Sequence, residues 1–230
     1  MPKLMPPDRR AERVVRCVFG LFLFGAGIAL MLRADVGTAP WDVFHTGVAE
    51  LLGVEVGTVI IATGVALLLL WIPLHERVGV GTVLNALLIG VFVDLIEPLL
   101  GGTDRLVPRL AMMALGIVLI GLGSGFYIGA GLGPGPRDGL MTGLSRRTIA
   151  GHAISVRTGR TFIEVVVLLA GIALGGALGV GTVAFTLGIG PLVHVFLPPL
   201  TMDGPAHEVD VDPLSGDVVE PLTGEAPGPA

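Results

Sequence analysis

The chain has 230 residues, of which 52% are hydrophobic and only 14% are charged, whereas soluble domains carry about 25% charged residues. Several stretches of about 20 residues carry almost no charge, and a helix of this length crosses the hydrocarbon core of a bilayer. The composition therefore excludes a soluble globular protein and predicts a polytopic membrane protein in contact with lipid. The single cysteine, Cys17, excludes a disulfide framework within one chain.

The formal net charge of −5 is unevenly distributed. Residues 1–12 form a basic N-terminus, whereas residues 201–230 contain no lysine or arginine. The acidic residues of this tail are Asp203, Glu208, Asp210, Asp212, Asp217, Glu220 and Glu225. Because so polar and proline-broken a segment cannot bury a core, we expect a disordered tail, and it is a candidate docking segment for a protein partner.

Residues 13–100 are expected to form a first membrane unit. An apolar helix over 14–33 leads through a Gly/Pro-broken turn into a short amphipathic helix over Pro40–Leu52. Proline in the first turn of a helix costs nothing, because the N–H it lacks has no intrahelical partner there. Two more apolar helices are expected over 57–74 and 81–99.

A linker over 101–108 leads to a second membrane unit over 109–200. Its expected helices cover 110–129, Pro136–Arg147, 158–177 and 181–199. A shift of 96 or 100 residues aligns this unit with the first and matches glycine, proline and aspartate in order. The aligned identities include Arg13/Arg109, Gly20/Gly116, Gly25/Gly121, Gly27/Gly123, Gly37/Gly133, Pro40/Pro136, Asp42/Asp138, Gly47/Gly143, Gly79/Gly179 and Thr82/Thr182. We therefore predict an internal duplication.

The sequence predicts an all-α transmembrane bundle of two tandem repeats, each with three spanning helices and one short re-entrant helix. A helix of about 13 residues reaches only some 20 Å, which is too short to span alone. Units with three crossings lie in opposite orientations, giving six spans as an inverted repeat. If both short helices cross as well, eight spans form parallel repeats. The distribution of Lys and Arg places both termini in the cytoplasm in either case.

Two motifs together resemble the YczE-like family of bacterial integral membrane proteins, which includes the YczE, YyaS and YitT types. The second copy carries Leu132-Gly133-x-Gly135-Pro136-Arg137-Asp138-Gly139-Leu140-Met141, then Arg157 and Glu164, then Gly179-Val180-Gly181-Thr182. The first copy carries Gly37-x-x-Pro40-Trp41-Asp42-Val43, then Gly79-Val80-Gly81-Thr82-x-x-Asn85. The resemblance covers residues 13–199 and implies a small protein of the bacterial inner membrane. It implies no substrate.

Asp42 and Asp138 occupy equivalent places in the first turns of the two short helices. One hypothesis is that two half-helices approach each other near the midplane and form a polar site, to which His45 and Arg137 contribute. The alternative is that each carboxylate complements the dipole of its own helix.

Ionisable residues within apolar helices are expensive and give further candidates. Arg157, Arg160 and Glu164 share one helical face, either as a charged site in the bundle or as a structural pair with interfacial arginines. Asp94 and His194 are equivalent and are either a proton-handling pair or interfacial residues. Asn85 can hydrogen-bond to a neighbouring helix.

The sequence contains no metal-ligand spacing, nucleophile–base pair or nucleotide-binding fingerprint, so we expect no cofactor and no enzyme activity. Its basic residues mark topology and do not form a nucleic-acid patch. The duplication, the two broken segments and the sparse intramembrane charge predict a permease or exporter for a small solute. The alternative is a non-transporting membrane protein that assists or regulates a partner through the acidic tail.

Overall fold

The computed structural model describes residues 8–74, 76, 78–145, 148–149, 152–153, 156–202, 210–211 and 218–219. Within these residues the chain is almost entirely helical, which confirms the predicted all-α fold. The α-helices are α1 Arg10–Ala34, α2 Pro40–Leu52, α3 Val56–Leu74, α4 Val80–Ile96, α5 Leu106–Gly129, α6 Pro136–Ser145, α7 Val156–Ala173 and α8 Val180–Leu200. A 3₁₀ turn, η1, covers Glu97–Leu99.

Local sequence determines where several helices begin and end. α2 and α6 begin at proline and carry aspartate in the first turn. α2 stops at Gly53, whose φ of +66° places it in the left-handed conformation that favours glycine. α7 ends at Ala173, four residues before the predicted end at 177, and Gly175 follows in a left-handed conformation with φ +84°. α6 ends at Ser145, and Arg147 lies outside the described residues.

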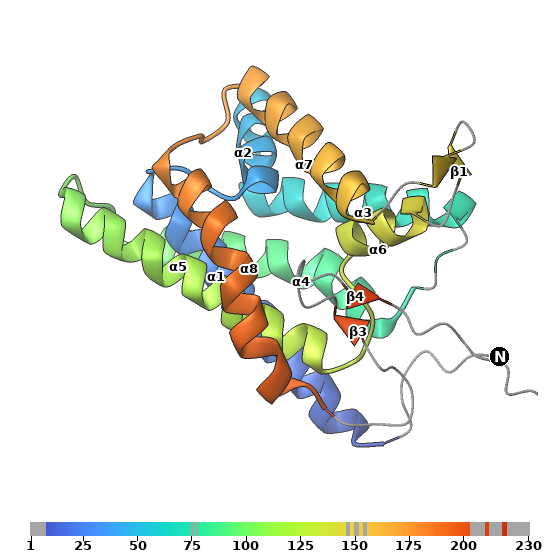
Figure 1. Ribbon diagram of the computed structural model, residues 1–230. Coiled ribbons are helices and arrows are strands. Elements are labelled where there is room, and N and C mark those ends of the chain that lie inside the picture. The colour runs from blue at the N-terminus through green and yellow to red at the C-terminus, as the bar shows by residue number, and fades with distance from the viewer. Residues whose placement is uncertain are drawn as a thin grey trace, which may run out of the picture.

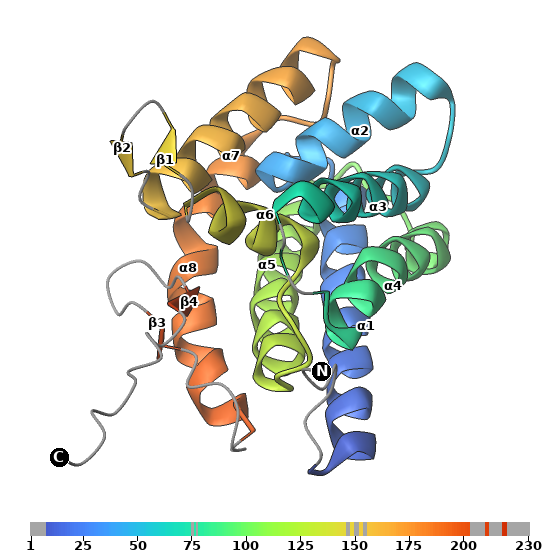
Figure 2. The same cartoon turned by 90° about the vertical axis from the view of Figure 1, so that its right-hand side faces the viewer.

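The centre of the molecule is the pair α1 and α5, which lie side by side in both views (Figures 1 and 2). A Cβ at Gly20 would lie 2.7 Å from the carbonyl oxygen of Gly123, and a Cβ at Gly27 would lie 2.6 Å from that of Gly116. The two helices are therefore antiparallel and approach closely enough that only glycine fits at these positions. Small residues commonly bring helices together in lipid, where their association gains little from the hydrophobic effect.

An arginine at the start of each central helix binds the end of the other. The Arg13 guanidinium donates to the carbonyl oxygen of Ala130 at 2.9 Å. The Arg109 guanidinium donates to the carbonyl oxygen of Ala34 at 2.7 Å and to Asp35. Cations at a helix C-terminus satisfy its unpaired carbonyls and complement its dipole. Arg13 and Arg109 are equivalent by sequence, as are Ala34 and Ala130.

The third long helix of each half, α4 in the first and α8 in the second, packs on the central pair in a matching way. A Cβ at Gly25 of α1 would lie 2.7 Å from the Cβ of Phe92 on α4, and a Cβ at Gly121 of α5 would lie 2.8 Å from that of Leu192 on α8. The two distances are alike because both pairs occupy aligned positions in the two copies of the sequence.

The turns and short helices of each half also pack against the other half. The Gly81 N–H donates to the Leu132 carbonyl at 2.8 Å, and the Gly181 N–H donates to the Val36 carbonyl at 2.7 Å. The turn after each central helix thus holds the start of the third helix of the other half. α2 packs mainly against α7, and α6 packs mainly against α3, as Figure 2 shows for α2 and α7 at the top of the molecule.

The outer faces of the long helices are apolar. Large exposed side chains cover them, among them Phe22, Leu69, Ile72, Leu87, Leu95, Leu115, Phe162, Leu169, Val183 and Leu187. Five helices are long and apolar enough to cross a bilayer, namely α1, α3, α4 with η1, α5 and α8. α7 has 18 residues and carries Arg157, Arg160 and Glu164, and it is not among these five. The chain is therefore a membrane protein whose outer surface contacts lipid.

Besides the helices and their connecting turns, the described residues include two short strand pairs. Thr148–Ile149 pairs with His152–Ala153, and Asp210–Val211 pairs with Val218–Val219, both antiparallel. These two-residue strands do not change the fold class. The predicted disorder and partner-binding role of the acidic tail concern residues that lie, apart from 201–202 and the second strand pair, outside the described residues.

Candidate functional site

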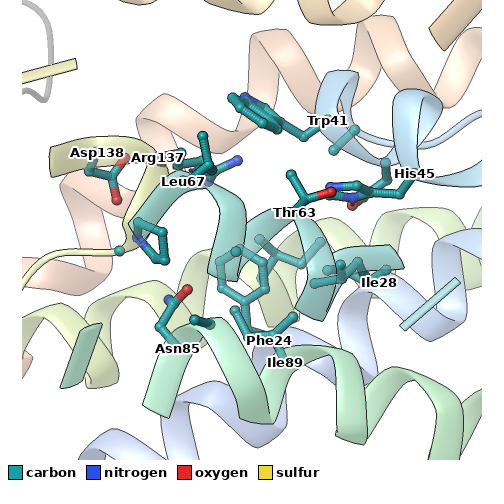
Figure 3. A pocket seen from close by; sticks show the side chains of 18 of the residues that line it. Phe24, Ile28, Trp41, His45, Thr63, Leu67, Asn85, Ile89, Arg137 and Asp138 are labelled. Carbon is teal, nitrogen blue, oxygen red and sulfur yellow. Dashed lines mark hydrogen bonds and ion pairs between the residues drawn. The ribbon is translucent and has the colours of Figure 1, made fainter. Parts of the chain in front are cut away.

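A cavity of about 80 Å³ lies where the two short helices meet the long ones (Figure 3). A water molecule takes about 30 Å³ of liquid volume, so the cavity has room for a few waters or one small solute. Its lining comes from the interior turns of α1, α3, α4, α5 and α8 and from the N-terminal turns of α2 and α6. Five of the residues predicted for the site lie here, namely Asp42, His45, Asn85, Arg137 and Asp138.

On the α2 side of the cavity, Asp42 and His45 form a buried pair. His45 Nδ1 lies 3.1 Å from Asp42 Oδ1, and the two residues are 6% and 5% exposed. One helical turn separates them, which is the spacing at which side chains meet on a helix. Trp41 lies beside them at 7% exposure. The indole Nε1 of Trp41 and the Nε2 of His45 are buried, and neither has a hydrogen-bond partner.

On the α6 side, Asp138 contacts a tyrosine and an arginine. The Tyr127 hydroxyl donates to Asp138 Oδ2 at 3.3 Å, and Arg137 Nε lies 3.9 Å from Asp138 Oδ1. Asn85 completes this side, because a Cβ at Gly135 would lie 3.0 Å from Asp138, 3.3 Å from Tyr127 and 3.5 Å from Asn85. Glycine at position 135 therefore leaves room for these three polar groups to converge. Figure 3 shows His45 and Asp138 on opposite sides of the cavity.

The N-terminus of α6 is held by Trp71 of α3. The indole N–H of Trp71 donates to the Pro136 carbonyl at 2.9 Å, and its ring lies directly against Gly139. Trp71 is 1% exposed, so this anchor is fully buried. It fixes the direction of the first turn of α6 and with it the positions of Arg137 and Asp138.

Asp94 and His194 do not line the cavity. Asp94 accepts a hydrogen bond from the Gly57 N–H at 2.6 Å and contacts the Thr58 hydroxyl at 3.5 Å, so it caps the start of α3. His194 is exposed on α8. Asp94 belongs to α4, which packs on α1 and α3, whereas His194 belongs to α8, which packs on α5. The structure does not bring them together as a pair.

Of the charged residues of α7, Arg160 and Glu164 are not part of the cavity lining. Arg160 Nε and Glu164 Oε1 are 3.3 Å apart, as their spacing suggests, and both side chains are about one-third exposed. Arg157 belongs to α7, but its side chain lies outside the described residues. The α7 charges therefore form a surface pair whose functional role stays a prediction.

Sequence reasoning missed Trp41, Thr63 and Tyr127, which also line the cavity. Aromatic and hydroxyl side chains in apolar helices are more often packing residues, so their type alone gives no signal. A signal for Trp41 did exist, because it stands between the proline and the aspartate that the two copies share, where the second copy has Arg137. Among the described residues, no group of three or more His, Cys, Asp or Glu is placed to hold a metal ion.

Comparison with known proteins gives a family match over most of the chain. The model of a family of unknown function, DUF6198, matches residues 11–198. An uncharacterized protein of Haemophilus influenzae is 36% identical over 78% of this chain and 81% of its own length. The uncharacterized membrane protein YczE of Bacillus subtilis is 34% identical over 82% and 88%, and the uncharacterized protein YyaS of the same species is 28% identical over 78% and 89%. No solved structure gives a significant match.

Proposed function

The chain belongs to the DUF6198 family of YczE-like membrane proteins, and from its central cavity we propose that it is a permease for a small solute. The observation that carries this proposal is the meeting of two equivalent short helices at one cavity, whose lining is mostly apolar and includes an aspartate from each helix. Asp42 and Asp138 hold the same place in their two helices, and both line this cavity. Secondary transporters commonly bind substrate where discontinuous helices from two repeats converge near the bilayer midplane.

The matching contacts of the two halves support an inverted repeat of six spans. Arg13 and Arg109 bind equivalent carbonyls at opposite ends of the central pair, a relation that an inverted duplication produces. We propose that α1, α3, α4, α5, α7 and α8 cross the membrane and that both termini face the cytoplasm. The location is the bacterial inner membrane.

Accessibility labelling tests this topology. Cysteine is introduced at Gly53 or at Ala150 in a Cys17→Ala background, and intact cells are treated with a membrane-impermeant maleimide. The six-span proposal expects the cysteine at 53 to react from outside and the cysteine at 150, which lies outside the described residues, to react only after permeabilisation. Reaction of both only from the cytoplasm would favour eight spans.

Flux into proteoliposomes tests the transport role. We expect uptake of a small solute by the purified protein, and loss of that uptake in Asp42→Asn and Asp138→Asn. Glu164→Gln is the control variant. Because Glu164 is outside the cavity lining, loss of its charge should leave the flux largely intact. Absence of flux for carboxylates, amines and amino acids alike would contradict the proposal.

We infer a carrier and not an enzyme.

A further inference from the structure

Two buried nitrogen atoms without partners mark one side of the cavity as a binding site. The Nε1 of Trp41 and the Nε2 of His45 are the atoms concerned. Leaving such a buried group unpaired costs about 1–3 kcal/mol. The two rings lie one helical turn apart on α2, with centroids 6.3 Å apart. Both side chains line the same cavity.

The two carboxylates of the cavity already have partners, and the donor groups that remain suit an oxyanion. Asp42 is bound to His45, and Asp138 accepts from Tyr127 and lies near Arg137. The unpartnered Trp41 nitrogen is an N–H donor. α2 has 13 residues and α6 has 10, and both direct their N-termini at the cavity. Helix N-termini carry positive partial charge and favour anions.

Charge balance requires a proton to enter with the anion. The charged lining groups are Asp42, Asp138 and Arg137, so with neutral His45 two carboxylates face one guanidinium and the net charge is −1. Tyr127 is the other titratable lining group. When His45 Nδ1–H donates to Asp42, the neutral ring presents a lone pair at Nε2, which repels an oxyanion. A proton at Nε2 converts this atom into a donor.

The helices packed against α2 add no charge that changes this balance. α3 contains no ionisable residue over Val56–Leu74. On α7, Arg160 and Glu164 pair with each other, and the side chain of Arg157 lies outside the described residues. We propose that the cavity binds a small carboxylate together with one proton, with the carboxylate oxygens accepting from Trp41 Nε1–H and from protonated His45 Nε2–H. The inference rests on the proposed transport role only in assigning this carboxylate as the transported solute.

Calorimetry on the full chain in detergent tests the inference directly. Acetate is titrated in two buffers of different ionisation enthalpy, which gives both the dissociation constant and the number of protons taken up. We expect saturable binding, uptake of about one proton per acetate, and a Kd that rises up to tenfold per pH unit wherever free His45 is neutral. Acetamide, an uncharged isostere, and methylammonium, a small cation, should not bind.

Two variants assign the binding to the named atoms. His45→Gln should abolish proton uptake and weaken acetate binding at least tenfold, and Trp41→Phe should weaken it about tenfold with proton uptake retained. His194→Gln is the matched control, because His194 is exposed on α8, and it should behave as wild type. Thermal unfolding of each variant verifies its fold, and the proton count on the wild-type protein needs no variant.

Three results would overturn the inference: acetate binding without proton uptake, saturable binding of methylammonium or acetamide, or no binding of formate or acetate. The transport proposal fails independently. Proton-linked acetate binding without flux would refute transport and leave the carboxylate site in place. Flux of another solute that acetate does not inhibit, with no acetate binding, would refute only the carboxylate assignment.

Discussion

The contact surface between α3 and α4, called a seam below, is tightly packed and therefore closed. The equivalent seam between α7 and α8 is open, because these two helices barely touch. Gly57 of α3 lies directly against Gly90 of α4, and a Cβ at Gly64 would lie 3.1 Å from Ala86. Asp94 of α4 also joins the two helices, because its carboxylate accepts a hydrogen bond from the Gly57 N–H at the start of α3. Within the described part of the chain, α7 and α8 make only marginal contact, and a Cβ at Gly190 would meet nothing within 4 Å.

The sequence accounts for this difference at a few aligned positions. Where α3 has Gly57 and Gly64, α7 has Arg157 and Glu164. Glycine lets two helix backbones touch, and α7 lacks both of these glycines. The asymmetry of charge between the two copies is therefore also an asymmetry of packing.

The largest effect is expected where the halves exchange a large and a small residue. Trp71 of α3 packs on Gly139 of α6, whereas the equivalent Gly171 of α7 lies against the backbone of α2 at Val43 and Phe44. Trp71→Ala should lower the free energy of unfolding by about 3–5 kcal/mol. Gly139→Val, which drives a side chain into the indole, should be similarly harmful.

The double variant Trp71→Ala/Gly139→Val sharpens the comparison. It gives positions 71 and 139 a small and a larger residue, as the aligned positions 171 and 43 have, and should recover about 1–3 kcal/mol relative to the sum of the single effects. Chemical unfolding in detergent measures the cycle. If the double variant loses as much stability as the two single variants together, positions 71 and 139 do not interact in the way that the comparison with positions 171 and 43 implies.

The second prediction compares the two seams through a matched pair of glycines. Gly90→Ala should destabilise by about 2–3 kcal/mol, because its Cβ meets the carbonyl of Gly57 and overpacks a close helix contact. Gly190→Ala adds the same methyl group to open space and should leave the melting temperature unchanged or slightly higher. Equal losses for the two variants in lipid nanodiscs would indicate that α7 closes on α8 in a bilayer.

The helices and both short segments could be predicted from sequence, because apolar length and Pro-x-Asp are local signals. That the N-terminal turns of both short helices line one cavity was only one of two interpretations that the sequence left open. The role of Asp94 could not, since its partner Gly57 is 37 residues away. A carboxylate in an apolar helix looks the same in sequence whether it caps a neighbour or binds a solute. Trp41 was missed for a related reason, because only the cavity shows that its indole nitrogen lacks a partner.

The third prediction compares the two arginine clasps of the central pair. The Arg13 side chain is 3% exposed and that of Arg109 is 25% exposed. Arg13→Gln removes charged hydrogen bonds from a buried site and should cost about 2 kcal/mol, since such bonds contribute about 1.5–3 kcal/mol each. Arg109→Gln should cost about 1 kcal/mol or less, because solvent screens an exposed ion pair and competes for its hydrogen bonds. Thermal melts of both variants measure the difference, and the reverse order would contradict the burial argument.

The smallest predicted effect separates the two residues at aligned positions 94 and 194. Asp94→Asn retains a side-chain acceptor for the Gly57 N–H but loses the charge near the start of α3, so a cost of about 0.5–1 kcal/mol is expected. Asp94→Ala removes the acceptor as well and should cost about 1–2 kcal/mol. His194→Ala should be neutral within about 0.5 kcal/mol, as for other exposed positions. If the Asp94 variants unfold as the wild type does but lose solute flux, Asp94 acts in transport, and the closed seam is held by its glycines alone.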